Sequence, residues 1–218
     1  MGSIIQNAAN NIGANGVFSS SALNNASLSG ITALPTGVGG KPKLLSTATA
    51  SGSSSISFTS GIDSTYDIYQ FEFINMHPST DTPQFEFNMS TDSGSNYNVT
   101  KTTTDFRAIH KEDGSGGSLE YRTGEDLAQS TAFQFLTHGT GGSADESCYG
   151  TLTLFNPSST VFVKHFIANL SDYFYDNFQM NLFIAGYGNT TNAINAISFK
   201  FASGNIDAGT IKMYGISA

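Results

Sequence analysis

Two short stretches of the chain alternate strictly between large apolar and polar side chains. Residues 67–75 place Tyr69, Phe71 and Phe73 at every second position, and residues 84–89 repeat the arrangement. Successive side chains of a β-strand point to opposite faces of its sheet. A period of two therefore predicts strands with one face buried in a core and one face wetted by solvent.

Further runs rich in β-branched and aromatic residues follow the same logic, and turn signals such as Asp92-Ser93-Gly94, Asp113-Gly114 and Asn156-Pro157 separate them. The runs are Leu44–Ala50, Ser55–Thr59, Tyr97–His110, Tyr149–Phe155, Val161–Leu170, Met180–Tyr187, Ala193–Phe201 and Thr210–Ile216. About ten short strands without a long helical pattern predict an antiparallel sandwich or barrel. Because Val161–Leu170 carries apolar side chains on both faces, we expect two sheets in a jelly-roll-like β-sandwich. Residues 125–135 allow one helical turn.

The first part of the chain has a different composition, rich in Ala, Asn, Gly and Ser. Leu28, Ile31 and Leu34 recur there every third residue, which matches neither a strand nor a helix period. An extended segment with one apolar row needs a partner surface. We therefore predict an assembly or anchoring arm over residues 1–42 and a β-sandwich domain over 43–218. The expected interface residues of the arm are Val17, Phe18, Leu23, Leu28, Ile31 and Leu34. A flexible linker is the alternative, because residues 36–40 are rich in glycine.

Charge and hydropathy exclude several partners. The formal net charge is -8 with only nine Lys plus Arg, and no basic cluster is present to neutralise phosphates, so nucleic acid is not an expected partner. No stretch of about 18 apolar residues exists, which argues against membrane insertion. The N-terminus lacks a signal-peptide pattern, so we expect the protein to be made and assembled in a host cytoplasm.

Candidate catalytic groups have no diagnostic spacing. Carboxylates that offer the pairs a glycosidase needs are Asp105, Glu112, Asp113, Glu120, Glu125 and Asp126. The histidines, none of them at a metal-ligand spacing, are His77, His110, His138 and His165. Cys148 opens a strand and is expected to be a half-buried thiol. We therefore expect no catalytic residue, no metal and no cofactor. A glycan-degrading enzyme is the weakest of the alternatives.

Two local motifs indicate turns and surfaces rather than catalysis. Residues 90–97 resemble the Asp-box, a β-hairpin motif of sialidases and other β proteins in which Asp accepts backbone N–H groups and Gly supplies a positive φ. Residues 171–178 gather aromatic rings beside Asp and Asn, a combination that suits a sugar site. The candidate glycan contacts are Tyr173, Phe174, Tyr175 and Phe178. Packing at the sandwich end or at a subunit interface is the favoured alternative.

Five stretches carry a resemblance to a known group of proteins: Ser60–Tyr66, Ser90–Thr100, Leu127–Ser130, Leu154–Ser159 and Ala202–Ile216. From about Leu44 to Ile216 the chain resembles virion structural proteins of marine tailed phages, of the fibre or decoration type. The resemblance implies a particle-bound β domain and supplies no catalytic residues.

The expected function is that of a non-enzymatic virion structural protein, a fibre, spike or decoration subunit of the capsid or tail. Its expected partners are other copies of itself, in a trimer, and other virion proteins contacted through the arm. Apolar rows of period three suit three extended chains that bury one another's side chains around a three-fold axis. The alternative is a module of a tail or head fibre that binds a host-surface glycan as receptor.

Overall fold

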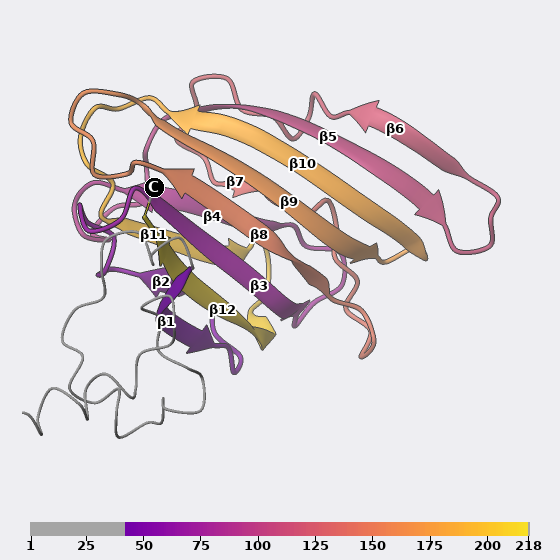
Figure 1. Ribbon diagram of the computed structural model, residues 1–218. Coiled ribbons are helices and arrows are strands. Elements are labelled where there is room, and N and C mark those ends of the chain that lie inside the picture. The colour runs from indigo at the N-terminus through magenta and orange to yellow at the C-terminus, as the bar shows by residue number, and fades with distance from the viewer. Residues whose placement is uncertain (1–41, 218) are drawn as a thin grey trace, which may run out of the picture. The chain divides into compact units, whose positions relative to one another are not determined.

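The computed structural model describes residues 42–217, and every regular element in that range is a strand (Figure 1). The strands are β1 Lys43–Thr49, β2 Ile56–Phe58, β3 Ile68–Pro78, β4 Phe85–Ser90, β5 Lys101–Lys111, β6 Gly117–Tyr121, β7 Gln134–Phe135, β8 Cys148–Phe155, β9 Lys164–Phe174, β10 Phe178–Gly188, β11 Ala196–Phe201 and β12 Ile206–Ile216. The predicted all-β class is confirmed.

The strands form two antiparallel sheets that pack against each other as a β-sandwich. The larger sheet has eight strands in the order β1-β12-β3-β8-β9-β10-β5-β6, and the smaller has four in the order β2-β11-β4-β7. Figure 1 shows the long strands of the larger sheet in front of the smaller sheet. The predicted sandwich is thus confirmed, with its strands divided unequally between the layers.

Phenylalanine rings hold the two sheets together. Phe199 on β11 is completely buried, and its ring lies against rings from both sheets. The ring centroids within 6.4 Å of it belong to Phe58, Phe71, Phe73, Phe85 and Phe87. Tilted, edge-on and stacked ring contacts of this kind add to the free energy gained by burying the rings. On β3, the predicted inward residues Tyr69, Phe71 and Phe73 are all part of this core.

The predicted wet face of β4 was wrong. Every residue of Phe85–Ser90 is buried, including Glu86 and Asn88. The segment around β7 covers the outer side of β4, where the Asn88 side chain donates to the carbonyl of Thr131 at 3.0 Å. Glu86 forms an ion pair with Lys200 at 3.1 Å. Alternation in the sequence shows which side chains of a strand are apolar. It does not show whether a loop covers the opposite face, and here such a loop buries the polar side chains as well.

Several predicted local features differ from the structure. The helical turn expected in 125–135 is absent among the described residues, where β7 pairs instead with β4. The turn at 91–96 forms as predicted, with Asp92 accepting from the backbone N–H of Asn96 at 2.8 Å and Gly94 at a φ of 87°. It does not close a hairpin, however, because β4 and β5 belong to different sheets.

The sandwich forms one compact unit, Gly40–Ala218, in which β1 begins at Lys43. The predicted arm interface lies outside the described residues; its members are Val17, Phe18, Leu23, Leu28, Ile31 and Leu34. Within residues 42–217 there is no helix long and apolar enough to cross a membrane.

Candidate functional site

The outer surface of the larger sheet lacks charged side chains over β8, β9, β10 and β5, which are neighbours in that order. Burial alternates along these strands and defines the outward positions. The outward residues, which we call the neutral face, are Thr102, Thr104, Phe106, Ala108 and His110 of β5, Gln179, Asn181, Phe183, Ala185 and Tyr187 of β10, His165, Ile167, Asn169, Ser171 and Tyr173 of β9, and Tyr149, Thr151, Thr153 and Phe155 of β8. None of them is Asp, Glu, Lys or Arg.

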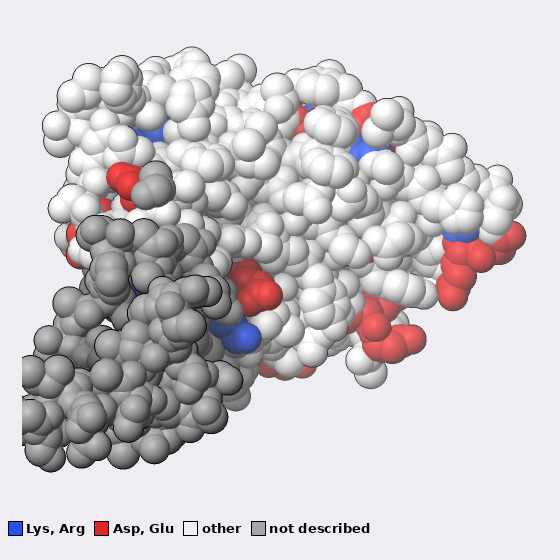
Figure 2. All heavy atoms as spheres, in the orientation of Figure 1, with Lys and Arg blue, Asp and Glu red and all other residues white. Residues whose placement is uncertain are grey.

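Figure 2 shows the same absence of charge on the surface. Almost no red or blue atoms lie over β8 and β9, while red groups lie below them near the middle of the view and at its right edge. The first opposite charges appear on the neighbouring strands, where Glu72 of β3 lies opposite Lys212 of β12. A protein of net charge -8 therefore has four neighbouring strands without Asp, Glu, Lys or Arg on their outward side.

Apolar side chains are exposed on the neutral face. Phe106 and Phe183 are cross-strand partners, and their rings stack with centroids 5.1 Å apart and an angle of 11° between planes. Each is 39% exposed, and Ile167 is 53% exposed. Tyr121 of β6 extends the row as the partner of Phe106. Contiguous exposed apolar groups without charge are typical of surfaces that contact a ligand or another protein.

A groove of about 510 Å³ crosses the neutral face. Its floor is low because Ala185 and Gly186 of β10 have small side chains or none, and Thr102 and Thr104 of β5 line one side. The taller residues around it are Phe155, His165, Ile167 and Tyr187. The rings of His165 and Tyr187 lie with centroids 6.0 Å apart.

An ordered set of amide and hydroxyl groups lies beside this groove. The Gln129 side chain donates to the Thr102 hydroxyl at 2.6 Å and reaches the Tyr187 hydroxyl at 3.5 Å. The Asn189 side chain donates to the Gln129 carboxamide oxygen at 2.7 Å. Gln129 has a φ of 50°, a left-handed conformation that costs energy in a residue other than glycine. The backbone thus holds Gln129 at the groove in a conformation it would not otherwise favour.

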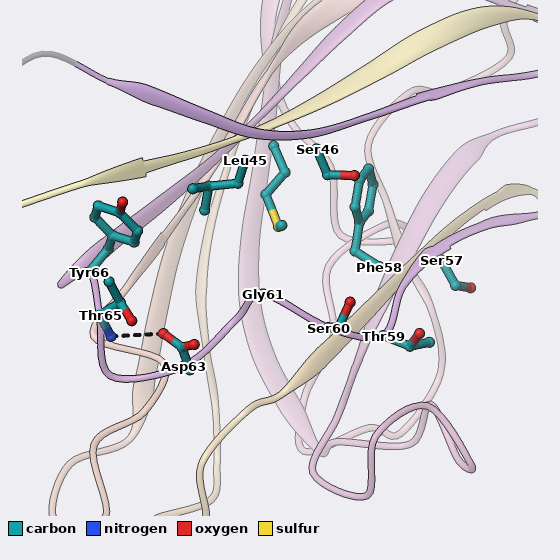
Figure 3. A pocket seen from close by; sticks show the side chains of 11 residues that line it. Leu45, Ser46, Ser57, Phe58, Thr59, Ser60, Gly61, Asp63, Thr65 and Tyr66 are labelled. Carbon is teal, nitrogen blue, oxygen red and sulfur yellow. Dashed lines mark hydrogen bonds between the residues drawn. The ribbon is translucent and has the colours of Figure 1, made fainter. Parts of the chain in front are cut away.

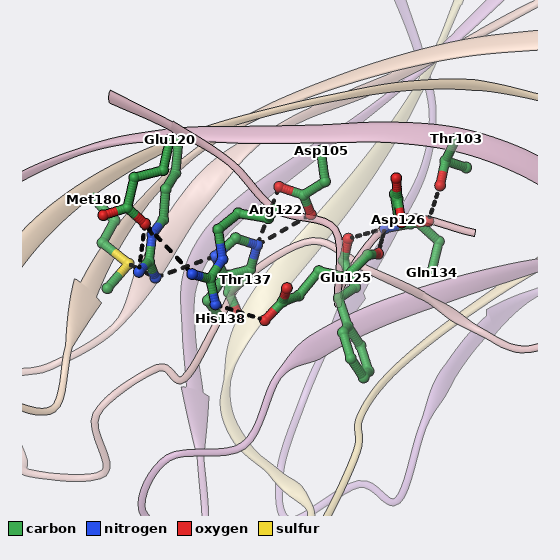
Figure 4. A network of polar contacts seen from close by, with 12 residues as sticks. Thr103, Asp105, Glu120, Arg122, Glu125, Asp126, Gln134, Thr137, His138 and Met180 are labelled. Carbon is green, nitrogen blue, oxygen red and sulfur yellow. Dashed lines mark hydrogen bonds and ion pairs between the residues drawn. The ribbon is translucent and has the colours of Figure 1, made fainter. Parts of the chain in front are cut away.

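Two of the carboxylates considered as catalytic pairs, Glu120 and Glu125, instead form an ion-pair network with arginines of β5 and of the segment after β6 (Figure 4). Arg107 and Arg122 contact Glu120 at 3.2 and 3.4 Å, and Arg122 also contacts Glu125 at 3.0 Å. The Ser118 hydroxyl, together with the two arginines, lowers the pKa of Glu120. Asp126 accepts from the Tyr121 hydroxyl, Glu112 from the Tyr173 hydroxyl and Asp113 from the backbone N–H of Ser115. The contacts of Arg122 with Glu120 and of Asp126 with Tyr121 fasten the segment after β6 to the sheet.

Asp105 and His138 form a buried pair that the sequence did not predict. His138 Nε2 lies 3.0 and 3.1 Å from the two carboxylate oxygens of Asp105, and Arg107 Nη1 lies 3.3 Å from His138 Nδ1. Both ring nitrogens of His138 therefore have a polar partner, Asp105 on one side and Arg107 on the other. The side chains of His138 and Asp105 are 1% and 0% exposed, so the pair is shielded from solvent.

Asp172 and Cys148 lie opposite each other on the inner side of β9 and β8. Within residues 42–217, neither carboxylate oxygen of Asp172 has a hydrogen-bond partner. Burial raises the pKa of Asp172 to about 7, and nearby polar groups of Thr140 and His138 offset only part of this effect. Cys148 is completely buried rather than half-buried, and burial raises its thiol pKa well above the usual value. Such a thiol is inert.

A buried lysine marks the crossing from the smaller to the larger sheet. Lys101 donates to the Asn88 side-chain oxygen at 2.6 Å and to the Val99 carbonyl at 2.9 Å. Burial lowers the pKa of Lys101 to about 7. Both acceptors are uncharged, and they hold the start of β5 against β4.

A second hollow, of about 410 Å³, lies beside the loop that follows β2 (Figure 3). It is lined by hydroxyl-bearing side chains, including Ser57 and Thr59, and by Asp63. The Asp63 carboxylate already accepts from the backbone N–H of Thr65 at 2.8 Å and from Tyr69 at 3.1 Å. The Thr65 contacts lower the pKa of Asp63, so this acid stabilises the turn.

The predicted glycan contacts come together at the β9–β10 hairpin, where Phe174 and Phe178 also pack against the core. Phe174 lies 4.4 Å from Tyr175 and 6.1 Å from Phe178 between ring centroids. Tyr173 donates toward Glu112 and Asn177. Tyr175 is the most exposed ring of the four, at 47%.

Neither the histidines nor the acids gather around a metal: within residues 42–217, no group of three His, Cys, Asp or Glu side chains is arranged to hold an ion. Comparison of the chain with protein-family models, with curated proteins and with solved structures found no match.

Proposed function

We propose that the chain is a non-enzymatic structural protein of a virus particle. Residues 1–42 attach it to the particle, and the β-sandwich is displayed outward as a fibre, spike or decoration subunit. The neutral face is the observation that carries this proposal. It is a broad, regular surface of aromatic, amide and hydroxyl groups, suited to contact with a partner.

The distribution of charge supports a role in contact. Acidic surfaces repel one another and keep a protein soluble. The neutral face exposes Phe106, Phe183 and Ile167 and has no charge to repel other molecules. An exposed apolar surface of this kind favours a role in binding. The ion pairs of Glu120 and Glu125 with arginine support a structural rather than catalytic use of those acids.

The partners in this proposal are other copies of the chain, as a trimer, and further virion proteins that the arm contacts. The location follows as the virion, after assembly in the host cytoplasm. The likeness of Leu44–Ile216 to virion proteins of marine tailed phages points the same way. Head and tail positions are both compatible with the proposal.

Changing Ile31 and Leu34 together to serine is expected to reduce incorporation into particles at least tenfold. Burying each such side chain is worth about 1.5–3 kcal/mol, and the loss is repeated in every copy of a symmetric interface. Quantitative mass spectrometry of purified particles measures the incorporation. The sandwich should keep its melting temperature, because all of its strands lie within Gly40–Ala218.

The matched control changes Ser29 and Thr32 to alanine, two polar positions of the same segment. This variant should be incorporated like the unaltered chain. Equal incorporation of the serine double variant would show that the segment is only a spacer and would remove the arm from the proposal.

A further inference from the structure

We propose that the groove on the neutral face binds an uncharged sugar unit of a glycan. This inference rests on the proposed function, because it names what the displayed face contacts. It places the glycan site between Ile167 and Tyr187 rather than at the β9–β10 hairpin.

The shape of the groove suits a flat ring. Ala185 and Gly186 lower the floor, while Tyr187, His165 and Ile167 stand around it. The groove volume of about 510 Å³ is in the range of small-ligand sites. The C–H face of a pyranose packs on an aromatic ring, and Tyr187 presents its ring at the edge of the hollow.

The polar groups beside the groove match sugar hydroxyls. Thr102 already accepts two hydrogen bonds, from the backbone N–H of Gln129 at 3.2 Å and from its side chain at 2.6 Å. Its own proton is therefore directed to a different acceptor. Asn189 uses one N–H on Gln129 and retains a second N–H and its carboxamide oxygen for further hydrogen bonds. These groups are fixed before a ligand arrives, which lowers the entropic cost of binding.

The charge around the groove selects an uncharged ligand. No Asp, Glu, Lys or Arg lines the groove, so a carboxylate-bearing sugar would lose its hydration without gaining a cationic partner. The net charge of -8 adds a repulsion toward acidic polysaccharides. Neutral hexoses and N-acetylhexosamines fit both conditions.

Titration of the full-length chain with a panel of neutral oligosaccharides tests the inference. The panel contains tetrasaccharides of glucose, galactose, mannose and N-acetylglucosamine, with glucuronate and galacturonate tetrasaccharides as acidic counterparts. We expect saturable binding to at least one neutral member and at least tenfold weaker binding to every acidic one. Isothermal calorimetry and ligand-observed NMR both report the affinity.

Variants locate the site. Tyr187→Ala should weaken binding at least tenfold, whereas Tyr187→Phe should retain most of it by keeping the ring. Gln129→Asn tolerates the left-handed backbone but withdraws the amide, and it should also weaken binding. Tyr149→Ala is the matched control, because this exposed tyrosine lies on the same face outside the groove. Melting curves confirm that each variant is folded.

Three outcomes overturn the inference. These are no binding to any neutral member at millimolar concentration, preferred binding to an acidic member, and binding that survives Tyr187→Ala but is lost in Tyr175→Ala. Incorporation of Tyr187→Ala into particles, measured in parallel, keeps the proposed function separate. Normal incorporation with no glycan binding would refute only the groove, and absence of the unaltered chain from particles would refute the proposed function itself.

Discussion

Replacing Phe199 by alanine is expected to lower the free energy of unfolding by about 3–5 kcal/mol. The side chain is completely buried, and its ring touches five other phenylalanine rings contributed by both sheets. Truncation leaves a cavity between the layers that rigid neighbouring rings fill poorly. Urea unfolding at a constant m-value measures the loss.

Phe162→Ala provides the matched control, since Phe162 is 68% exposed and its loss should change the free energy of unfolding by less than about 1 kcal/mol. A loss below about 1.5 kcal/mol for Phe199→Ala would show that the Phe199 ring is not tightly packed between the two sheets.

The second large effect is a dependence of stability on pH that comes from Asp172. Its pKa is raised from an ordinary 3.8 to about 7, mainly by burial. Between these two values the folded state holds a proton that the unfolded state has released. The free energy of unfolding therefore falls as pH rises from about 4 to about 7, by up to about 4 kcal/mol, and the penalty stays constant above that range.

Asp172→Asn removes this titration and should remove most of the decline, leaving the smaller part that comes from Glu86, whose pKa burial also raises. The variant should therefore exceed the unaltered protein in stability at pH 7. Urea unfolding at several pH values checks this. Asp176→Asn, an exposed aspartate of the same hairpin, should leave the decline in place. Lys101, with its pKa lowered to about 7, changes stability in the range above pH 7 and does not mask the effect. Parallel profiles for Asp172→Asn and the unaltered chain would contradict the prediction.

The sequence predicted most strands because their apolar residues face a core. β3 is the clearest case. Its apolar residues Tyr69, Phe71 and Phe73 alternate with polar residues in the sequence, and in the structure they are the buried positions between less buried ones. β6 was missed because its Gly-Ser-Leu-Glu-Tyr sequence has no buried face, and Leu119 is 73% exposed. β7 has two residues and forms only because β4 offers an edge to pair with.

The candidate site depends on contacts between distant parts of the chain. The absence of charge at Thr102, Thr104 and Phe106 can be read from alternation within one strand. The contact between Phe106 and Phe183 cannot be read in this way, because it depends on the pairing of β5 with β10, two segments that are distant in the sequence. Asp105 and His138 are likewise brought together across the fold, with no spacing signal to predict it.

A readable signal was nevertheless present at Asp172. The inward-facing residues of β9 include Phe166, Ala168 and Leu170. The next inward-facing position, two residues further along the strand, is Asp172. Continuing the alternation past the last apolar residue would have placed this acid in the core.

Labelling of intact particles tests the central claim most directly. The chain has one cysteine, Cys148, which is completely buried and gives little background. Ser115→Cys introduces a thiol in the exposed turn between β5 and β6 with minimal change in volume, outside the neutral face. A fluorescent maleimide added to purified particles that carry this variant should label the chain in most copies and should leave the unaltered chain unlabelled. Particles that lack the chain, or that contain it with Ser115→Cys protected from the maleimide, would contradict an outward-displayed sandwich.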